Sequence, residues 1–512
     1  MSDRKLRWLG LGLVATAGVG VLGLSTMMSS ASAHADDIGL VMGGSGTPIP
    51  GMDYVEAAYR LYLDNPGTML YPDLTFYQAT AANPFGNGLF TPEGFYPLTG
   101  VQTLPLNYPA AIDGFPSLST SVGQGMAILE STIAADTEAG DTSIVRGFSQ
   151  SATISSLVMR QLDPSGTPQT GPLDPQFLLT GDPSNPNGGL LERFNGFETT
   201  NGDVHSLELN LPSLGVSFDG ATPSDDYVTN IYTLEYDGYA DFPRYPLNFL
   251  SDLNAFLGIE TIHGTYLDLG VGGSGPTAEQ IANALLLPGS ALDSTANSLT
   301  NYYMIDETAP LVALLPKSLQ DLLGPDLTYL INLGYGDGTL GYAVTADAPA
   351  NVPTPFGLFP DVSLSTVLST LATDTQQGIT AFENDLANPA ALLASVEPAS
   401  GQSFTDLLSA LSADAANPAA SLTDFINALS TAASAAYSTV LPTADIVNAL
   451  VTSIPAYDVA LFSANLTAGD LLDAFGLPIA ADTALTTLAA GFEVTVLQDA
   501  ATQIADAFSG LF

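Results

Sequence analysis

Short apolar runs alternate with helical patterns in the first half of the chain, from residue 38 to about residue 269. The runs have strand length, and most of them end in Gly, Asp or Pro, which favour turns. The run at residues 142–146 is followed at once by a helical stretch at residues 151–162. This alternation predicts an α/β fold with a mostly parallel sheet flanked by helices. The expected strands are residues 38–42, 142–146, 177–180 and 227–236.

The last part of the chain has a different pattern. From about residue 362 it is rich in Ala, Leu, Ser and Thr, and beyond Lys317 it has no Lys or Arg but 20 Asp or Glu. One apolar helix face is indicated by four residues with the spacing i, i+3, i+4, i+7: Leu364, Val367, Leu368 and Leu371. We therefore expect residues 362–512 to form an acidic, mainly helical C-terminal region.

The first residues have the layout of a secretory signal peptide. Three basic residues among the first seven, an apolar run at residues 8–28 and the small-x-small sequence Ala33-His34-Ala35 follow in order. Five Gly in the run favour a leader, residues 1–35, that is cleaved after general export to the cell envelope or medium. The rival interpretation is an uncleaved anchor that associates the protein with the membrane, since about 20 apolar residues can span a bilayer. Loss of His34 leaves His205 and His263 as candidate bases.

Charge and composition exclude several functional classes. The chain has 512 residues, with 9 Lys+Arg against 53 Asp+Glu and a formal net charge of −44. This charge argues against a nucleic-acid partner and against electrostatic anchoring to anionic lipid, because phosphates would be repelled. The absence of Cys excludes disulfides, a thiol nucleophile, Cys-ligated zinc and iron–sulfur clusters. No Asp-rich calcium loop occurs, so we expect neither a metal nor a cofactor.

The clearest chemical motif is Gly147-Phe148-Ser149-Gln150-Ser151, between an expected strand and an expected helix. Gly-x-Ser-x-small at such a turn is the nucleophile elbow of α/β hydrolases. The chain folds back tightly there, so the residues two before and two after the nucleophile must be small; Ser151 replaces the commoner Gly. The turn projects the Ser149 hydroxyl above the sheet and directs the N–H of Gln150 at a developing oxyanion. The alternative is an ordinary buried turn.

A second oxyanion donor is expected from the loop after an early strand. Residues 43–47 have that position, and their glycines let the backbone approach a substrate closely. A phosphate-binding loop is excluded because no Lys follows the glycines. We expect the donor between Ser45 and Thr47, and the alternative is an ordinary Gly-rich turn.

The base and the acid are expected after the nucleophile, in the order nucleophile, acid, base. His263 follows the last strand-like run, whereas His205 precedes the run at residues 227–236, so we prefer His263 as the base. Two acids follow that run, Asp237 and Asp241. We prefer Asp241, because Asp237 precedes Gly and is also explained as a turn former. The acid would orient the imidazole and stabilise its charged form.

Seven motifs in order along the chain resemble the PE-PPE domain, a mycobacterial family of cutinase-like serine hydrolases. They are at residues 43–48, 147–151, 181–183 with 187–189, 236–243, 254–258, 263–266 and 333–337. The resemblance covers residues 37–361 and implies an α/β-hydrolase fold, with Ser149 as nucleophile, His263 as base and an acid in the 237–241 loop. Family members hydrolyse short- to medium-chain acyl esters, and some relatives transfer acyl chains between trehalose glycolipids. This chain departs from many members, because we expect a signal peptide where they carry an N-terminal PE or PPE module.

Together these features predict an exported serine esterase that acts on lipid-like acyl esters through an acyl-enzyme, with Ser149, Asp241 and His263 as its triad. An acyltransferase acting on cell-envelope trehalose glycolipids would use the same residues, and a non-catalytic surface interaction protein is a third hypothesis. The expected divisions are a leader at 1–35, a hydrolase core at 36–275, a cap or extension of that domain at 276–361, and the helical region at 362–512.

Overall fold

The computed structural model describes residues 37–45, 50–63, 74–75, 118–195, 207–269, 275–293, 298–387 and 421–509. The expected leader at residues 1–35, Thr47 and His205 lie outside the described residues. What the sequence indicates about them therefore stays a prediction.

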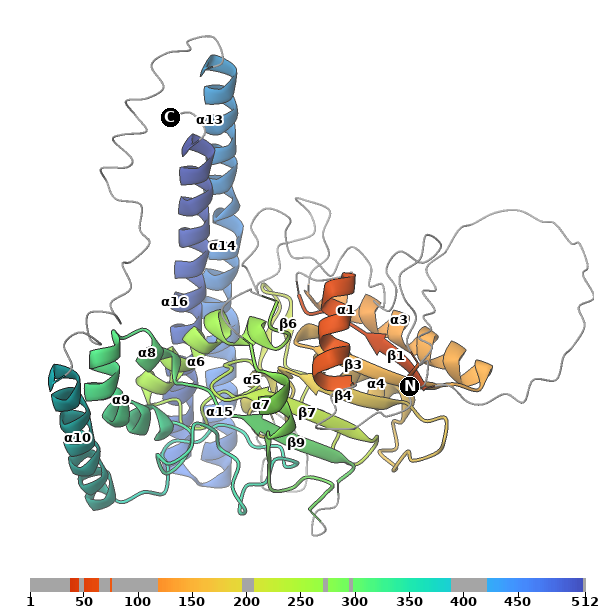
Figure 1. Cartoon of the computed structure of the whole chain (residues 1–512), viewed down its shortest axis with the longest axis horizontal. Coiled ribbons are helices and arrows are strands. Elements are labelled where there is room, and N and C mark those ends of the chain that lie inside the picture. The colour runs from red at the N-terminus through yellow and green to blue at the C-terminus, as the bar shows by residue number, and fades with distance from the viewer. Residues whose placement is uncertain are drawn as a thin grey trace, which may run out of the picture.

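A seven-stranded sheet forms the centre of the hydrolase region (Figure 1). Neighbouring strands run parallel, except that β8 at one edge is antiparallel to β9. This confirms the predicted α/β-hydrolase-like fold. From edge to edge the strands are β2 (Leu74–Thr75), β1 (Asp37–Val41), β3 (Thr142–Phe148), β4 (Gln176–Thr180), β7 (Thr229–Leu234), β9 (Thr300–Ile305) and β8 (Leu285–Leu286). A separate ribbon pairs β5 (Asn210–Leu211) with β6 (Val216–Ser217).

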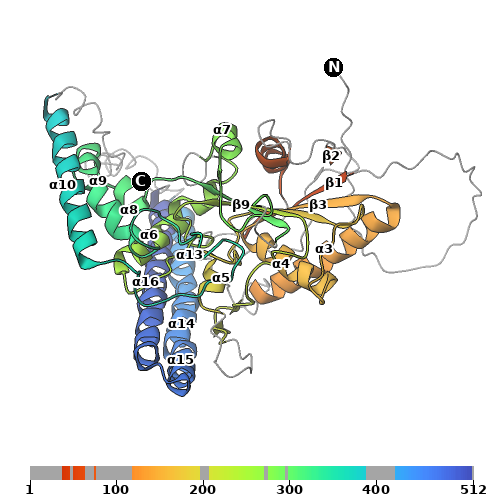
Figure 2. The same ribbon diagram turned by 90° about the horizontal axis from the view of Figure 1, so that it is seen from below.

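Both faces of the sheet are buried under helices. In β3, Ile144 packs into the apolar cluster on one face and Val145 into the cluster on the other, and Leu178 and Leu179 of β4 divide in the same way. This alternation follows from the period of two along a strand, and strands covered on both sides are apolar throughout. One face carries α1 (Met52–Ala58), η1 (Tyr59–Leu63) and α7 (Ala278–Ala282), and the other carries α3 (Leu118–Ala139) and α4 (Gln150–Leu162) (Figure 2).

Strand β9 lies beyond residue 275, in the region 276–361 that was expected to be a cap or an extension of the hydrolase domain. It pairs in parallel with β7, so residues 300–305 extend the central sheet. Its Asn and Tyr side chains obscure the apolar pattern of a strand, yet Tyr303 stacks on Tyr232 of β7 with 4.6 Å between ring centroids. The helices that follow the later strands are α5 (Leu190–Arg193), α6 (Phe249–Thr261), η3 (His263–Thr265), α8 (Pro310–Ala313) and α9 (Lys317–Asn332).

The described parts of the C-terminal region, residues 364–387 and 421–509, are helical, as predicted, and they pack on the hydrolase region (Figure 1). Helix α10 (Leu364–Ala387) lies along α9, and residues 421–509 form a long helical hairpin, called here the C-terminal hairpin. Two stretches of the hairpin, Asn427–Ala468 and Leu471–Ala507, are long and apolar enough to cross a membrane, a property that buried helices of soluble proteins share. The hairpin consists of α13 (Ser421–Ser438), α14 (Val440–Asn448), η4 (Ala449–Ser453), α15 (Ile454–Ala468) and α16 (Leu471–Ser509).

Buried carboxyl groups make the stability of this fold depend on pH. Burial raises the pKa of Glu235 to about 7, although its carboxylate accepts N–H bonds from Gly341 at 2.9 Å and Glu307 at 3.3 Å. Because the pKa is higher in the folded state, the folded protein keeps this proton between about pH 4.5 and pH 7 while the unfolded chain releases it. The free energy of unfolding therefore falls as the pH rises through that window.

We expect the Tm measured by calorimetry to fall between pH 5 and pH 7.5, and to fall less in Glu235→Gln, which cannot titrate. Burial also raises the pKa of Glu192 to about 7, so Glu192 contributes to the decrease in Tm that remains in the variant. An identical fall in the variant would contradict the role given to Glu235.

Candidate active site

Ser149 lies in a sharp turn between β3 and α4, as the motif predicts. Its backbone has φ 55° and ψ −120°, a sparsely populated combination for a residue with a side chain. Gly147 permits the turn, because a Cβ there would lie 2.8 Å from the backbone oxygen of Ser151 and 3.0 Å from the backbone nitrogen of Ala152. The Ser151 hydroxyl accepts the N–H of Phe148 at 2.8 Å and donates to the Phe148 carbonyl at 3.0 Å. A serine in place of the commoner glycine therefore adds hydrogen bonds that close the turn.

His263, at the start of η3, lies beside the nucleophile. Its Nε2 is 2.7 Å from the Oγ of Ser149, and its Nδ1 is 2.9 and 2.8 Å from the two carboxylate oxygens of Asp237. An ionised carboxylate can only accept, so Nδ1 carries the proton and Nε2 is left to accept from the hydroxyl. The imidazole packs between the rings of Phe148 and Tyr239, with centroid distances of 5.1 and 4.7 Å. These contacts hold the orientation in which the base meets the serine.

The carboxylate that meets His263 belongs to Asp237 and not to Asp241, which corrects the preferred acid. Strand β7 ends shortly before this loop, and Tyr236, with φ 65°, turns the chain so that Asp237 lies at the carboxyl edge of the sheet. Asp241 points back into the turn, where its Oδ2 accepts the N–H of Tyr236 at 3.0 Å. Burial raises the pKa of Asp241 well above its ordinary value, and the charge of buried Arg193 opposes that rise. Asp237 is thus both the turn former and the partner of the imidazole.

Tyr266 contacts Asp237, a role that the sequence alone does not indicate. Its buried hydroxyl donates to Oδ2 of Asp237 at 2.8 Å and accepts the N–H of Leu234 at 3.0 Å. Burial, with the nearby charge of Asp237, raises the pKa of Tyr266 well above its ordinary value, so the hydroxyl keeps its proton. The signal in the sequence is its position in the same short motif as His263, residues 263–266.

The backbone N–H of Gln150 lies in the first turn of α4, where a helix leaves its N–H groups without intrahelical acceptors. The side chain of this residue is held on both sides: Ser45 Oγ donates to its Oε1 at 2.6 Å, and its Nε2 donates to Ser121 Oγ at 3.0 Å. The loop after β1 also reaches the nucleophile, because a Cβ at Gly44 would lie 3.2 Å from the Cβ of Ser149. The structure therefore brings Ser45 and Gln150 together beside the nucleophile.

A cavity of about 610 Å³ opens onto Ser149 and His263. This volume lies within the range of roughly 300–1,000 Å³ that small-molecule sites have. Most of the side chains that line it are apolar; those of the hydrolase region include Val122, Met126, Leu157, Leu190, Leu211 and Leu214. Within the part of the chain that the structure describes, no group of three or more His, Asp or Glu side chains is placed to hold a metal ion.

The geometry predicts different effects for two Asp-to-Asn changes. In Asp237→Asn the imidazole loses the acceptor that fixes its tautomer, so we expect the rate at which a fluorophosphonate labels Ser149 to fall by about ten-thousandfold. In Asp241→Asn the contact to His263 remains, and we expect the labelling rate per folded molecule to stay within about tenfold of wild type.

The measurement is a labelling time course, with circular dichroism to give the folded fraction of each variant. A larger loss in folded Asp241→Asn than in folded Asp237→Asn would contradict the assignment of the acid.

Comparisons with known proteins identify the family of the chain. Residues 84–336, which include Ser149, Asp237 and His263, match the family model of the PE-PPE domain. The chain is 39% identical to an uncharacterized PPE family protein of Mycobacterium tuberculosis, PPE28, over 97% of this chain and 71% of that protein. It is 37% identical to Esterase PE16 and 36% identical to PE family protein PE3 of the same organism, over 66% of this chain in each case. It spans 55% and 61% of the lengths of these two relatives. The chain belongs to the PE-PPE domain family.

Proposed function

We propose that the protein is a serine esterase that cleaves lipid-like acyl esters through an acyl-enzyme. The observation that carries the proposal is the position of His263, 2.7 Å from the Oγ of Ser149 and 2.8 Å from the carboxylate of Asp237. The 37% identity to Esterase PE16 supports the same class of reaction. The apolar cavity beside the nucleophile suits an acyl chain better than a charged group.

In the first half of the reaction, the Ser149 oxygen attacks the ester carbonyl carbon while Nε2 of His263 accepts the hydroxyl proton. Asp237 holds the imidazole in the required tautomer and stabilises its charged form. The N–H of Gln150 donates to the oxyanion of the tetrahedral intermediate, and one such donor accelerates acyl transfer by about 10²–10³. On collapse, the imidazolium proton passes to the leaving alcohol oxygen, the alcohol departs and Ser149 is acylated.

In the second half, a water molecule attacks the acyl carbon and gives its proton to Nε2 of His263. Collapse of this intermediate releases the carboxylic acid and returns the proton to Oγ of Ser149. Transfer to a sugar hydroxyl needs only that the hydroxyl replace the water. The same residues would therefore serve the acyltransferase alternative, and the two activities differ in the acceptor.

The backbone of Ser149 weighs against a non-catalytic surface protein. A side-chain-bearing residue in a sparsely populated backbone region costs about 1–3 kcal/mol. A scaffold that serves only interaction has no need for that strain, nor for a buried carboxylate aligned with the imidazole. Both features follow from the demands of nucleophilic catalysis.

The test is hydrolysis of p-nitrophenyl acyl esters by the purified protein, together with fluorophosphonate labelling. We expect labelling and hydrolysis in the wild type, loss of both in Ser149→Ala, and a fall of several orders of magnitude in His263→Ala. Repeating the assay with trehalose, and searching for an acylated sugar by mass spectrometry, identifies the acceptor. A folded wild-type protein that neither labels nor hydrolyses any ester would refute the esterase proposal.

We also propose that the protein is exported, which rests on the layout of residues 1–35. N-terminal sequencing of protein recovered from the cell envelope or culture medium is expected to begin at Asp36. An intact leader on membrane-bound protein would favour the anchor instead.

A further inference from the structure

The cavity at Ser149 has walls from two parts of the chain. Helices α3, α4 and α6 and residues 211–219 line it on the side of the hydrolase region. The C-terminal hairpin lines it as well, although the family match ends at residue 336. The hairpin residues are Ile446, Ala449, Leu450, Ile454, Leu485, Leu488, Ala489 and Phe492, and all of them are apolar.

The hairpin is fixed to the hydrolase region by specific contacts beside this wall. Tyr457 donates its hydroxyl proton to the carbonyl of Phe194 at 3.1 Å, and Ser213 donates to the carbonyl of Asp445 at 2.9 Å. Phe492 meets Phe256 of α6 edge to face, with 5.5 Å between ring centroids. The wall is therefore a built part of the site.

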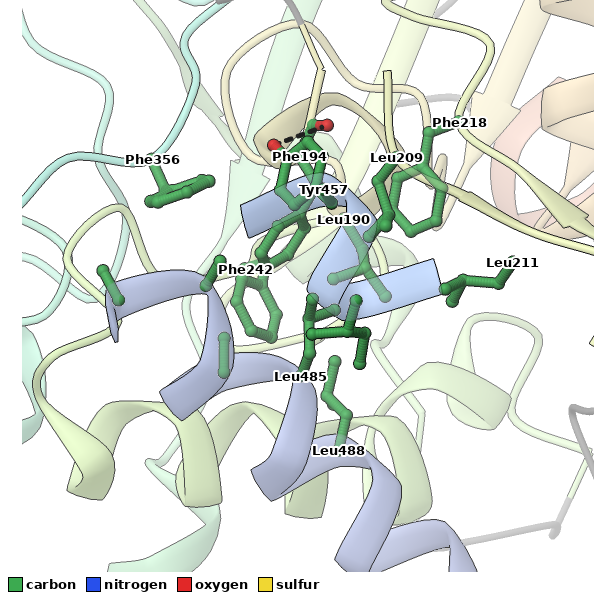
Figure 3. Packing of buried hydrophobic residues seen from close by; sticks show 14 of the residues in the cluster. Leu190, Phe194, Leu209, Leu211, Phe218, Phe242, Phe356, Tyr457, Leu485 and Leu488 are labelled. Atoms are coloured by element: carbon green, nitrogen blue, oxygen red, sulfur yellow. Dashed lines mark hydrogen bonds between the residues drawn. The ribbon is translucent and has the colours of Figure 1, made fainter. Parts of the chain in front are cut away.

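Figure 3 shows how closely the two regions interdigitate. Leu485 and Leu488 project from α16 toward Leu190 of the hydrolase region, and all three belong to one buried cluster. The same three side chains also line the cavity. The core packing that holds the hairpin in place thus continues directly into the surface that a substrate would meet.

We propose that the C-terminal hairpin forms the acyl-chain site of this esterase and sets the longest acyl chain that it accepts. The proposal rests on the esterase function proposed above and identifies its substrates as esters of a single aliphatic chain that is buried against residues 446–492. The occupant follows from position: a group bound in this cavity is next to Ser149 and His263, so it belongs to the molecule under attack.

The charges around the cavity favour a neutral aliphatic chain. Among the described residues that line it there is no Lys or Arg, while Asp219 and Glu260 contribute carboxyl groups. A phosphate or a sulfate would find no cation there, and burying an unpaired charge is costly. An aliphatic chain, in contrast, binds more favourably with each methylene that the apolar walls of the cavity remove from water.

The chain-length dependence follows from the same physics. Each methylene that enters the cavity should raise kcat/KM by up to about fourfold, until the cavity is full. Further methylenes gain nothing, because they stay in water or clash with the wall. The position of that limit is therefore a measure of where the wall lies.

Two adjacent alanines of α16 give a matched test. Ala489 lines the cavity, whereas Ala490 is exposed to solvent. The assay measures kcat/KM for p-nitrophenyl esters from acetyl to palmitoyl, so that only the acyl chain varies. In Ala489→Trp we expect the limit to move to shorter chains, with a loss of more than about tenfold for the longest good wild-type substrate and less than about threefold for acetyl. Ala490→Trp should reproduce the wild-type profile.

A second variant, Leu450→Ala, enlarges the cavity and should move the limit to longer chains. A wild-type profile in folded Ala489→Trp or in folded Leu450→Ala would overturn the acyl-site proposal, and so would the same change of profile in Ala490→Trp. The failure of the esterase proposal looks different. In that case the wild-type protein itself would neither hydrolyse any ester nor react with a fluorophosphonate probe.

Discussion

The strained turn at Ser149 is the constraint on which the site depends. Its left-handed φ is maintained because β3 is hydrogen-bonded on both sides, to β1 and β4, and α4 begins at the next residue. In this turn the Oγ of Ser149 lies 2.7 Å from Nε2 of His263. Gly181 leaves the room for the imidazole, because a Cβ at that position would lie 3.1 Å from the Cε1 of His263. The glycines at 147 and 181 thus leave the space that the turn at Ser149 and the ring of His263 require.

The parallel sheet gathers the other partners around that turn. Carboxyl ends of parallel strands meet at one edge, which is where ligands bind in open α/β sheets. Ser149 follows β3 and Asp237 follows β7, while α6 returns the chain so that His263 lies between them. The hydroxyl of Tyr266 then joins the acid to the end of β7 through Leu234. The C-terminal hairpin adds apolar side chains to the walls of the cavity that opens onto Ser149.

Predictions from the sequence agree best with the structure where a feature depends on a few residues that are neighbours in the chain. The elbow is such a case, because Gly147 and Ser151 are demanded by contacts within five residues of chain. Chain order likewise favoured His263, whose Nε2 lies 2.7 Å from the Oγ of Ser149. Strand β9 was not expected, because its Asn and Tyr residues do not give the apolar pattern of a buried strand. Its place in the sheet becomes clear only from its pairing with β7. The contribution of residues 446–492 to the cavity was not expected either. An apolar helix face predicts that the face is buried, but it does not indicate which segment of the chain it packs against.

The sequence by itself therefore determined the turn at Ser149 and the helical pattern of the C-terminal region, because each depends on spacing within one local segment. It also determined the α/β class, because strand-like and helical runs alternate along residues 38–269. The tertiary structure decided which of two nearby carboxylates meets the base. Asp237 and Asp241 are close in sequence, but Tyr236 has a positive φ that turns the chain between strand and loop. The Asp237 carboxylate then meets His263, whereas Asp241 accepts the N–H of Tyr236. The tertiary structure also decided that the hairpin completes the cavity, because that packing joins distant segments, with Ser213 and Asp445 separated by 232 residues and Phe194 and Tyr457 by 263.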